Sequence, residues 1–309
     1  MTEDMQTPPA PATDTKAGFV AIVGPTNAGK STLTNRLVGT KVSIVTPKVQ
    51  TTRTRVTGIV NRGPCQIVFV DTPGVFAPKR RLDRAMVAAA WAGAADADLV
   101  VMVVDAERGI DDAVEAVVKG LKQGGRRALL ALNKIDLVKR EKLLGLAAAM
   151  NERFDFDATF MISAQGGSGC DDLMAAIESR LPPGPWLFPE DQLSDLPERL
   201  LASEITREKI YLRLHQELPY SIHVETESWK DQKDGSVRIE QVIYVERDGQ
   251  KAIVLGKGGA TVKIIGSMAR EEMEQIFDRR VHLFIFVKVR ADWTNDREHY
   301  RSMGLDWQD

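Results

Sequence analysis

Cysteine and histidine are scarce in this sequence, which argues against two kinds of site. The two cysteines, Cys65 and Cys170, lie far apart and have no CxxC or Cys/His spacing. A disulfide framework and a structural zinc site are therefore not expected, and two free thiols suit a reducing compartment. The four histidines show no metal-ligand spacing either, and we expect surface or sheet positions for His215, His223, His282 and His299.

Long apolar runs are also missing. The longest, residues 86–95, is rich in alanine and reaches only about half the length that spans a bilayer. We expect it to form a packed helix and not a membrane anchor. The first residues are acidic where a signal peptide would be basic, and a Pro/Ala/Thr-rich stretch follows. We therefore predict a cytoplasmic protein whose residues 1–17 form a disordered leader.

An excess of either charge is missing as well. The chain has 41 Lys and Arg against 43 Asp and Glu, a formal net charge of −2. It therefore has no bulk field that would gather nucleic acid or an anionic membrane, and any site for a polyanion must rest on local clusters of charge. With 309 residues, 43% of them hydrophobic, the chain is long enough for roughly two domains with a core each.

Short apolar runs do occur, and from Gly18 onward they alternate with helical patterns. Each run is apolar without interruption, which is typical of parallel strands covered on both faces. The runs are residues 19–23, 67–70, 99–104, 128–132 and 159–162, and helical spacing marks residues 111–122 and 139–152. Repeated βα units of this kind predict an α/β domain with a mostly parallel sheet, which we place at residues 18–182.

The second half of the chain has a different pattern. Prolines and a glycine at 182–185 end the alternation, because proline neither continues a helix interior nor donates to a strand ladder. We assign residues 183–198 to a linker. Beyond it, a helical pattern over 199–214 precedes strands that alternate with period two, most clearly at 281–289. Such strands have one covered face, so we predict a smaller α+β domain with an antiparallel or mixed sheet over 199–309.

A phosphate-binding loop follows the first apolar run. Residues 24–31 fit the pattern GxxxxGK[ST] between a strand and a helix. Backbone amides of such a loop surround phosphate oxygens, Lys30 would reach the terminal phosphates, and Ser31 would ligate Mg²⁺. The predicted nucleotide-binding positions are Gly24, Pro25, Thr26, Asn27, Ala28, Gly29, Lys30, Ser31 and Thr32. This loop by itself fits an ATPase, a nucleotide kinase or a GTPase.

The identity of the base is indicated by the motif NKID at 133–136, which follows a strand. The Asp136 carboxylate can accept from the N1–H and the exocyclic amine of guanine, a pair of donors that adenine lacks. Asn133 would join this loop to the phosphate-binding loop, and the stem of Lys134 would cover the base. After the last strand, Ser163–Ala164 suits a backbone contact to the guanine oxygen. Together these residues predict GTP and GDP as ligands.

A second motif around the phosphates predicts a magnesium-dependent switch. Asp71, Thr72, Pro73 and Gly74 follow the strand at 67–70. Asp71 can hold Mg²⁺ through water, and the Gly74 N–H can meet the γ-phosphate. Between the motifs lies a polar, threonine-rich loop, residues 45–55, which we expect to order around Mg²⁺ and the γ-phosphate. Either Thr51 or Thr52 should be the Mg²⁺ ligand, and the spacing does not choose between them.

These motifs resemble the translation-factor-related class of GTPases, and the Era family in particular. Val75 stands where Ras-like proteins place a water-orienting glutamine, and Asn27 stands where Era relatives carry an asparagine associated with potassium. The resemblance implies slow hydrolysis of GTP to GDP and phosphate, with K⁺ held partly by Asn27 as a source of positive charge. Arg53 and Arg55 compete for that role. The implied catalytic residues are Lys30, Asn27, Thr52 and Gly74.

The second domain contains a signature for RNA. Residues 254–265 fit the KH pattern, in which a GxxG loop joins two helices and clamps a single-stranded backbone. From 249 to 270 the chain has four basic residues and no Asp or Glu, which gives a local basic stripe in a nearly neutral protein. The predicted RNA-binding residues are Lys251, Gly256, Lys257, Gly258, Gly259, Lys263 and Arg270. The element order, with a strand and a short helix at the end, resembles a type II KH domain.

Both domains in this order resemble the Era family over nearly the full chain. That family binds GTP and, through its KH domain, single-stranded sequence near the 3′ end of small-subunit ribosomal RNA, and acts in assembly of the small ribosomal subunit. The resemblance implies a cytoplasmic monomer with peripheral contact to the cytoplasmic face of the inner membrane, although no residue argues for that contact independently. Two alternatives stay open: a binding module whose hydrolysis is incidental, and a signalling GTPase with a protein effector, which the GxxG segment disfavours.

Overall fold

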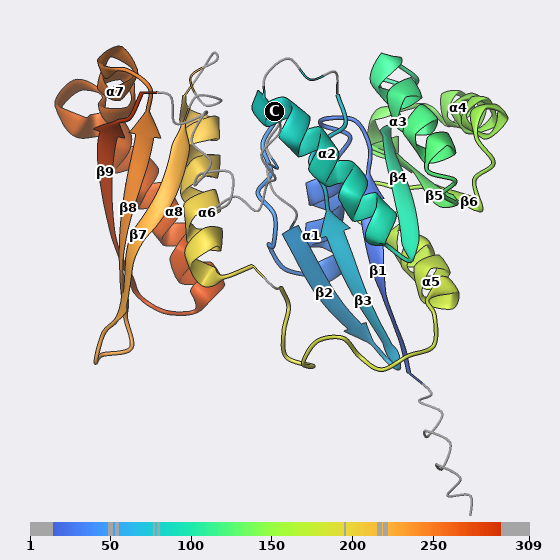
Figure 1. The fold of residues 1–309 in the computed structure, drawn as a ribbon, viewed down its shortest axis with the longest axis horizontal. Helices are drawn as coiled ribbons and strands as arrows, with labels where there is room; N and C mark the ends of the chain where they lie inside the picture. The colour runs from blue at the N-terminus through green and yellow to red at the C-terminus, as the bar shows by residue number, and fades with distance from the viewer. Residues whose placement is uncertain are drawn as a thin grey trace, which may run out of the picture.

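The computed structural model describes residues 15–48, 52, 56–76, 78, 81–194, 196–214, 218 and 222–291, and these form two sheets with separate helices (Figure 1). Most of the predicted leader lies outside the described residues, but its last two residues, 16 and 17, already belong to strand β1 (Lys16–Val23). The short helix expected after the last strand lies outside them as well, beyond residue 291.

The first domain is built on a six-stranded sheet with the order β2-β3-β1-β4-β5-β6. Its other strands are β2 (Val56–Arg62), β3 (Cys65–Asp71), β4 (Leu99–Asp105), β5 (Ala128–Asn133) and β6 (Ala158–Met161). All neighbouring pairs are parallel except β2 and β3. The five apolar runs all lie in strands, apart from Ile162, which directly follows β6, and this confirms the predicted α/β fold. The sequence analysis missed β2, because Thr57, Gly58 and Asn61 interrupt its apolar residues.

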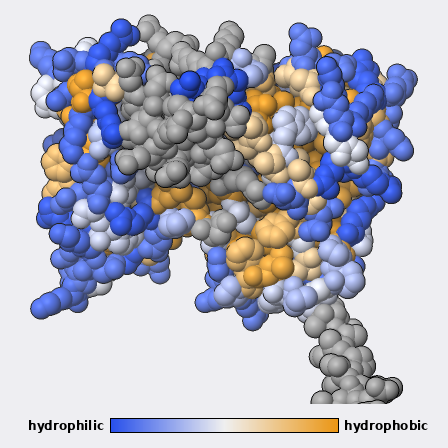
Figure 2. Space-filling model, in the orientation of Figure 1, coloured by the Kyte–Doolittle hydropathy of each residue, from blue (hydrophilic) through white to orange (hydrophobic). Residues whose placement is uncertain are grey.

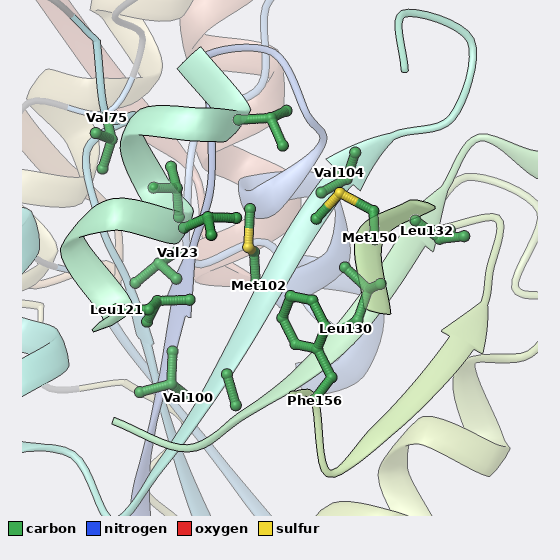
Figure 3. Packing of buried hydrophobic residues seen from close by; sticks show 14 of the residues in the cluster. Val23, Val75, Val100, Met102, Val104, Leu121, Leu130, Leu132, Met150 and Phe156 are labelled. Carbon is green, nitrogen blue, oxygen red and sulfur yellow. The ribbon is translucent and has the colours of Figure 1, made fainter. Parts of the chain in front are cut away.

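Helices cover both faces of this sheet. They are α1 (Lys30–Val38), α2 (Arg81–Asp96), α3 (Asp112–Gln123), α4 (Arg140–Arg153) and α5 (Cys170–Arg180). Helices α2, α3 and α4 contribute to one apolar cluster, and α1 and α5 contribute to the cluster on the other face. In the first cluster, Met102 and Leu130 of adjacent strands lie with Leu121 and Met150 of the helices (Figure 3). Burial of each such side chain stabilises the fold by about 1.5–3 kcal/mol, so the strand ends form a rigid base for the loops that follow them.

The alanine-rich run at 86–95 lies inside α2. Met86, Ala90 and Ala94 recur every four residues and are 1%, 0% and 2% exposed, so one side of the helix packs into the domain. This confirms the prediction of a packed helix. On the face of the molecule seen in Figure 2, hydrophilic residues predominate over the domain at the left, and apolar residues form patches among hydrophilic ones on the domain at the right.

The segment between the domains is attached to the sheet and does not hang free. It runs along the outer edge of β2, where the Ile59 N–H donates to the Leu193 carbonyl at 2.8 Å. The fully buried side chain of Gln66 accepts from the N–H groups of Leu187 and Phe188 at 2.6 and 2.9 Å. The predicted linker is therefore, over these residues, an addition to the first domain. The domain boundaries themselves stay a prediction.

The second domain follows the order α6 (Glu198–Arg213), β7 (His223–Asp231), β8 (Val237–Val245), α7 (Asp248–Leu255), α8 (Ala260–Phe277) and β9 (Val281–Val289). Strands β7 and β8 are antiparallel, whereas β8 and β9 are parallel, so the sheet is mixed, one of the two arrangements that were predicted. The parallel pair requires a crossover, which α7 and α8 supply. This arrangement is the predicted type II KH fold.

One helical stretch, Asp248–Phe277, is long and apolar enough to cross a membrane when judged by length and composition alone. Those two properties are weak support for a span, and the backbone here is interrupted. Gly258 has a φ of 61° inside the turn Lys257–Gly259, which separates the eight residues of α7 from the 18 of α8. The stretch is therefore two helices of the KH domain joined by its GxxG turn.

Candidate nucleotide and RNA sites

The phosphate-binding loop joins β1 to α1, and its backbone requires glycine at two positions. Gly24 has a φ of 153°, and a Cβ there would lie 2.3 Å from the Val103 carbonyl oxygen. Gly29 has a φ of 96°, and a Cβ there would lie 2.2 Å from Nδ2 of Asn133. No side chain fits either position, so the loop can curl tightly against the ends of β4 and β5.

Lys30 is buried at the start of α1, with 6% of the residue exposed. Its ammonium donates to the carbonyl oxygens of Gly24 at 3.2 Å and Pro25 at 2.9 Å, so the charge is held inside the curl of the loop. Burial lowers the pKa of Lys30 to about 8, and the carboxylate of Asp71 opposes that shift. An anion in the loop would favour the charged form of this lysine.

Three oxygen-bearing side chains meet beside Lys30. The Ser31 hydroxyl donates to Oδ2 of Asp71 at 2.7 Å and lies 2.9 Å from Oγ1 of Thr52. Burial raises the pKa of Asp71, and the Ser31 hydroxyl lowers it. Within the described part of the chain, Oδ1 of Asp71 is buried without a hydrogen-bond partner. Hydroxyl and carboxylate oxygens with one buried oxygen to spare are a donor set that suits Mg²⁺.

Of the two predicted threonine ligands, Thr52 lies at this cluster. Thr51 lies outside the described residues, so the choice between them stays a prediction. Gly74 lies across the cleft, packed so closely that a Cβ would stand 2.6 Å from the Thr26 side chain. The next residue, Val75, is 4% exposed and points into the core (Figure 3). A side chain that is buried and apolar cannot orient a water molecule, as expected from the sequence.

The NKID motif connects three loops. Asn133 donates from Nδ2 to the Ala28 carbonyl at 2.9 Å, and its Oδ1 accepts from the Ala164 N–H at 2.9 Å. Lys134 is left-handed, with a φ of 66°, and its ammonium contacts Oδ2 of Asp105 at 2.6 Å. Asp136 is exposed on the turn Ile135–Leu137. The three loops that the sequence assigned to phosphate and base therefore meet at the carboxyl ends of β1, β5 and β6.

A cleft of about 410 Å³ opens over these loops. The predicted residues along it are Thr26, Asn27, Gly29, Lys30, Ser31, Thr32, Thr52, Gly74 and Lys134. Six other predicted residues form hydrogen bonds to lining residues or to each other: Gly24, Pro25, Ala28, Asp71, Asn133 and Ala164. The Ser163 hydroxyl accepts from the Gly166 N–H at 3.0 Å, and the Thr72 hydroxyl donates to the Ile22 carbonyl at 2.8 Å. Pro73 precedes Gly74 in the chain. Residues 45–47 of the loop expected to order around Mg²⁺ and the γ-phosphate also line the cleft. So do Ile44, Arg108 and Gln165, to which the sequence analysis assigned no ligand contact.

The signal for two of the missed residues was their place in the chain. Arg108 follows the carboxyl end of β4, and Gln165 follows Ser163–Ala164 after β6. Ligands of open α/β sheets bind at that edge, so any polar side chain after such a strand was a candidate. Arg53 and Arg55, the predicted competitors of K⁺, lie outside the described residues.

The GxxG turn of the KH domain has free space around its last two glycines, whereas the glycines of the phosphate-binding loop are closely packed. Gly258 and Gly259 have φ values of 61° and 80°, and a Cβ on either would meet nothing within 4 Å. A Cβ on Gly256 would lie 2.2 Å from Oγ1 of Thr261, so this glycine closes the start of α8. Lys257 is exposed at the tip of the turn. A ligand backbone can therefore approach the turn closely.

A groove of about 450 Å³ runs between α8 and β9. Lys263 and Arg270 line it from the helix, together with residues 281–285 of the strand. Gly266 faces the strand, with Ile285 at 3.4 Å from the place of a Cβ. The strand residues were not predicted as ligand contacts, although their period-two pattern shows which of them face the helix.

Comparison with known proteins covers both domains. Residues 19–134 match the family described as 50S ribosome-binding GTPase, and residues 217–294 match the KH domain family. GTPase Era of Rhizobium meliloti is 60% identical over 307 residues, which cover 99% of this chain and 98% of that protein. GTPase Era of Agrobacterium fabrum is 62% identical over 96% of this chain and 93% of its own length.

This chain belongs to the Era family of GTPases. Two solved Era structures share 39% identity with it and cover 94% of it and 99% of their own chains. One is an Aquifex aeolicus Era variant bound to GDP·AlF4⁻, with a TM-score of 0.89. The other is Era in complex with MgGDPNP and nucleotides 1506–1542 of 16S ribosomal RNA, with a TM-score of 0.90. The agreement extends over both domains, so these lie relative to each other much as they do in those structures.

Proposed function

We propose that this member of the Era family hydrolyses GTP as a switch, and binds single-stranded RNA near the 3′ end of small-subunit ribosomal RNA during assembly of the small ribosomal subunit. The observation that carries the proposal is the presence, in one chain, of the oxygen cluster beside Lys30 and an open GxxG turn above a basic groove. The solved relative with MgGDPNP and 16S ribosomal RNA nucleotides shares both domains with this chain.

The nucleotide is bound by loops that the fold already holds in place. Lys30 would contact the terminal phosphates, and the Gly74 N–H would donate to the γ-phosphate. Asp136 would accept from the two guanine donors, while the backbone of Ser163–Ala164 would meet the guanine oxygen. The bridging of these loops by Asn133 supports the assignment, because a preformed pocket loses little entropy on binding.

Magnesium is the proposed metal of the oxygen cluster. Ser31 and Thr52 would hold it through their hydroxyls, and Asp71 through water, with its spare Oδ1 available as an acceptor. Bound Mg²⁺ neutralises charge on the β- and γ-phosphates. The protein's own part is positional: Lys30 would fix the phosphates, and the side chain at 75 would not orient the attacking water because Val75 is buried and apolar.

Potassium is the proposed source of further positive charge during hydrolysis. Asn27 supports this, since it lines the cleft in a left-handed conformation, with a φ of 62°, and donates to the Pro47 carbonyl at 2.9 Å. A bound K⁺ would place positive charge beside the phosphates, where a Ras-like protein uses an arginine. Arg53 and Arg55 stay the alternatives, and hydrolysis in K⁺ and Na⁺ distinguishes them.

RNA is the proposed ligand of the KH groove. Lys257, Lys263 and Arg270 would contact phosphates, and Gly258 and Gly259 would let the RNA backbone approach closely. Bases would lie along β9, where strand residues line the groove. Lys251 and Gly256 complete the proposed set, the first through its charge and the second through the geometry of the turn.

The cytoplasm is the proposed location, because ribosomes assemble there, and a monomer is the proposed state. Peripheral contact with the cytoplasmic face of the inner membrane rests on the family resemblance alone. The apolar stretch Asp248–Phe277 lends it little support, since length and composition alone are weak evidence and the GxxG turn interrupts the helix.

Crosslinking of the full chain to RNA tests the proposed function. The probe is a labelled RNA with the 3′-terminal small-subunit sequence, offered with GDPNP or with GDP, and a scrambled RNA of equal length is the control. We expect crosslinks at residues 256–270 and β9 that depend on sequence and on the nucleotide. Equal crosslinking of both RNAs would contradict the ribosomal target, and single-turnover hydrolysis with and without RNA would separate a timer from incidental hydrolysis.

A further inference from the structure

Helix α6 of the KH domain carries charged residues that are buried. Arg207, Glu208 and Lys209 are 2%, 4% and 8% exposed, although residues of these types are almost never buried unless paired. The helix lies on the side of the KH domain that faces the GTPase domain (Figure 1). The charges at 208 and 209 are therefore located where the two domains meet.

Glu208 of α6 contacts the GTPase domain through both of its carboxylate oxygens. Its Oε2 accepts from the ammonium groups of Lys41 at 2.7 Å and Lys209 at 2.8 Å. Its Oε1 accepts from the backbone N–H of Val45 at 2.9 Å. Lys41 and Val45 belong to the GTPase domain, in the segment that leads from α1 toward Thr52.

That segment forms one wall of the nucleotide cleft, which residues 44–47 line. Contacts of the described residues that hold this wall include the Val45 N–H donating to Glu208, Asn27 donating to the Pro47 carbonyl and, from the residue after the wall, Lys48 donating to the Leu214 carbonyl at the end of α6. The first and the third come from the KH domain. The wall is therefore held between the phosphate-binding loop and the RNA-binding domain.

We propose that Glu208 of the KH domain is a positioning residue for the nucleotide site, acting through its hydrogen bond to the Val45 N–H. With this bond, the cleft wall is fixed and Thr52 is delivered to Ser31 at the metal-binding cluster. Without it, the wall keeps the contacts made by Asn27 and Lys48 but loses the one at Val45, so the nucleotide must supply more of its order, which weakens binding. The loss of affinity should be larger for nucleoside triphosphates than for diphosphates, since Thr52 and Gly74 are placed to meet Mg²⁺ and the γ-phosphate.

Glu272 of α8 provides a matched control. It also accepts from Lys41 and from Lys209, so it shares the ionic contacts of Glu208. It has no hydrogen bond to Val45 among the contacts of the described residues. A neutral residue at 272 therefore perturbs the charge cluster and leaves the hydrogen bond to the cleft wall intact.

The test compares full-length Glu208→Ala, Glu208→Met, Glu208→Gln and Glu272→Gln with the parent protein. Binding of a fluorescent, non-hydrolysable GTP analogue and of fluorescent GDP is measured by titration. We expect Ala and Met at 208 to weaken the triphosphate about tenfold and GDP less than about twofold, as loss of a hydrogen bond to a charged group implies. Glu208→Gln keeps an acceptor oxygen, so it and Glu272→Gln should stay within about twofold of the parent.

Methionine fills the volume of the glutamate, so the test survives if the alanine variant does not fold. Hydrogen exchange at the Val45 amide of the parent, where we expect strong protection, needs no variant at all. Parent-like triphosphate binding by folded Ala or Met variants would overturn the proposal. It would also be overturned by equal weakening in Glu208→Gln and Glu208→Ala, or by exchange of the Val45 amide at the rate of an exposed loop.

Discussion

The nucleotide cleft and the RNA-binding region proposed for the KH domain both offer glycines and lysines for contact with phosphate, yet they are built in opposite ways. In the cleft, Gly29 has Asn133 against it and Lys30 is buried. In the GxxG turn of the KH domain, Gly258 has open space around it and Lys257 is exposed. The cleft is fixed by packing, so a single change there should be costly. The GxxG turn and the groove beside it would act as a charged surface, so their affinity for RNA should be the sum of many weaker contacts.

Alanine at the two glycines gives the largest contrast. Gly29→Ala places a Cβ 2.2 Å from Nδ2 of Asn133 at a left-handed φ of 96°, so the amide that bridges the loops must move. We expect GTP affinity to fall on the order of 100-fold or more, measured by calorimetry. Gly258 also has a left-handed φ, of 61°, but a Cβ there would meet no atom within 4 Å. Gly258→Ala should therefore change RNA affinity less than about fivefold. Equal losses in the two variants would remove the distinction.

Substitution at the base-selecting residue should have the next largest effect. Asp136→Asn presents a donor where guanine also has donors, so GTP affinity should fall about 100-fold. Xanthosine triphosphate, whose base carries an acceptor at that position, should gain by a similar factor. Competition between the two nucleotides measures both changes. Equal GTP affinity in variant and parent would rule out this role for Asp136.

Reversal of charge at the GxxG turn tests the surface character of the groove. Lys257→Asp combined with Gly258→Asp adds two negative charges and removes one positive charge beside the RNA backbone. RNA affinity should fall by about tenfold at moderate salt, with a shallower salt dependence because fewer counterions are released. GTP binding should not change. Unaltered RNA affinity in a folded variant would move the RNA site elsewhere, and loss of GTP binding would contradict the division into two domains.

Exchange of the monovalent cation should give the smallest effect. Hydrolysis should be about fivefold faster in K⁺ than in Na⁺ at equal ionic strength, which is about 1 kcal/mol of barrier. The difference should vanish in Asn27→Ala, which keeps the buried Val75 and the Mg²⁺ cluster. Single-turnover rates measure it. Equal rates in the two salts for the parent would leave Arg53 or Arg55 as the next candidate.

The sequence predicts those parts of the molecule in which local pattern and burial agree. Uninterrupted apolar runs predict the buried parallel strands, and fixed spacing around Lys30 and Asp136 predicts which loops meet. Strand β2 was not predicted, because it lies at the edge of the sheet and mixes polar with apolar residues. Spacing also cannot separate Thr51 from Thr52, because both precede β2 in a loop without periodicity.

Contacts between distant elements could not be predicted from pattern alone. Glu208 sits in a helix of ordinary amphipathic appearance, and its partner Val45 lies 163 positions earlier in the chain. Arg108 lines the nucleotide cleft although no motif includes it. Such contacts depend on how elements dock after they form, and a single sequence carries no signal for that.

The attachment of residues 187–194 to β2 also bears on solubility. An edge strand with free N–H and carbonyl groups is a template for pairing with another chain, and β2 is such an edge. Here the Ile59 N–H is taken by Leu193, and the Thr57 carbonyl by the Ser194 hydroxyl. A GTPase fragment that ends at residue 182 would lose this cover and expose the unpaired backbone groups of β2 to other chains. A fragment that extends to residue 197 would keep the edge closed and should stay monodisperse at concentrations where the shorter one aggregates.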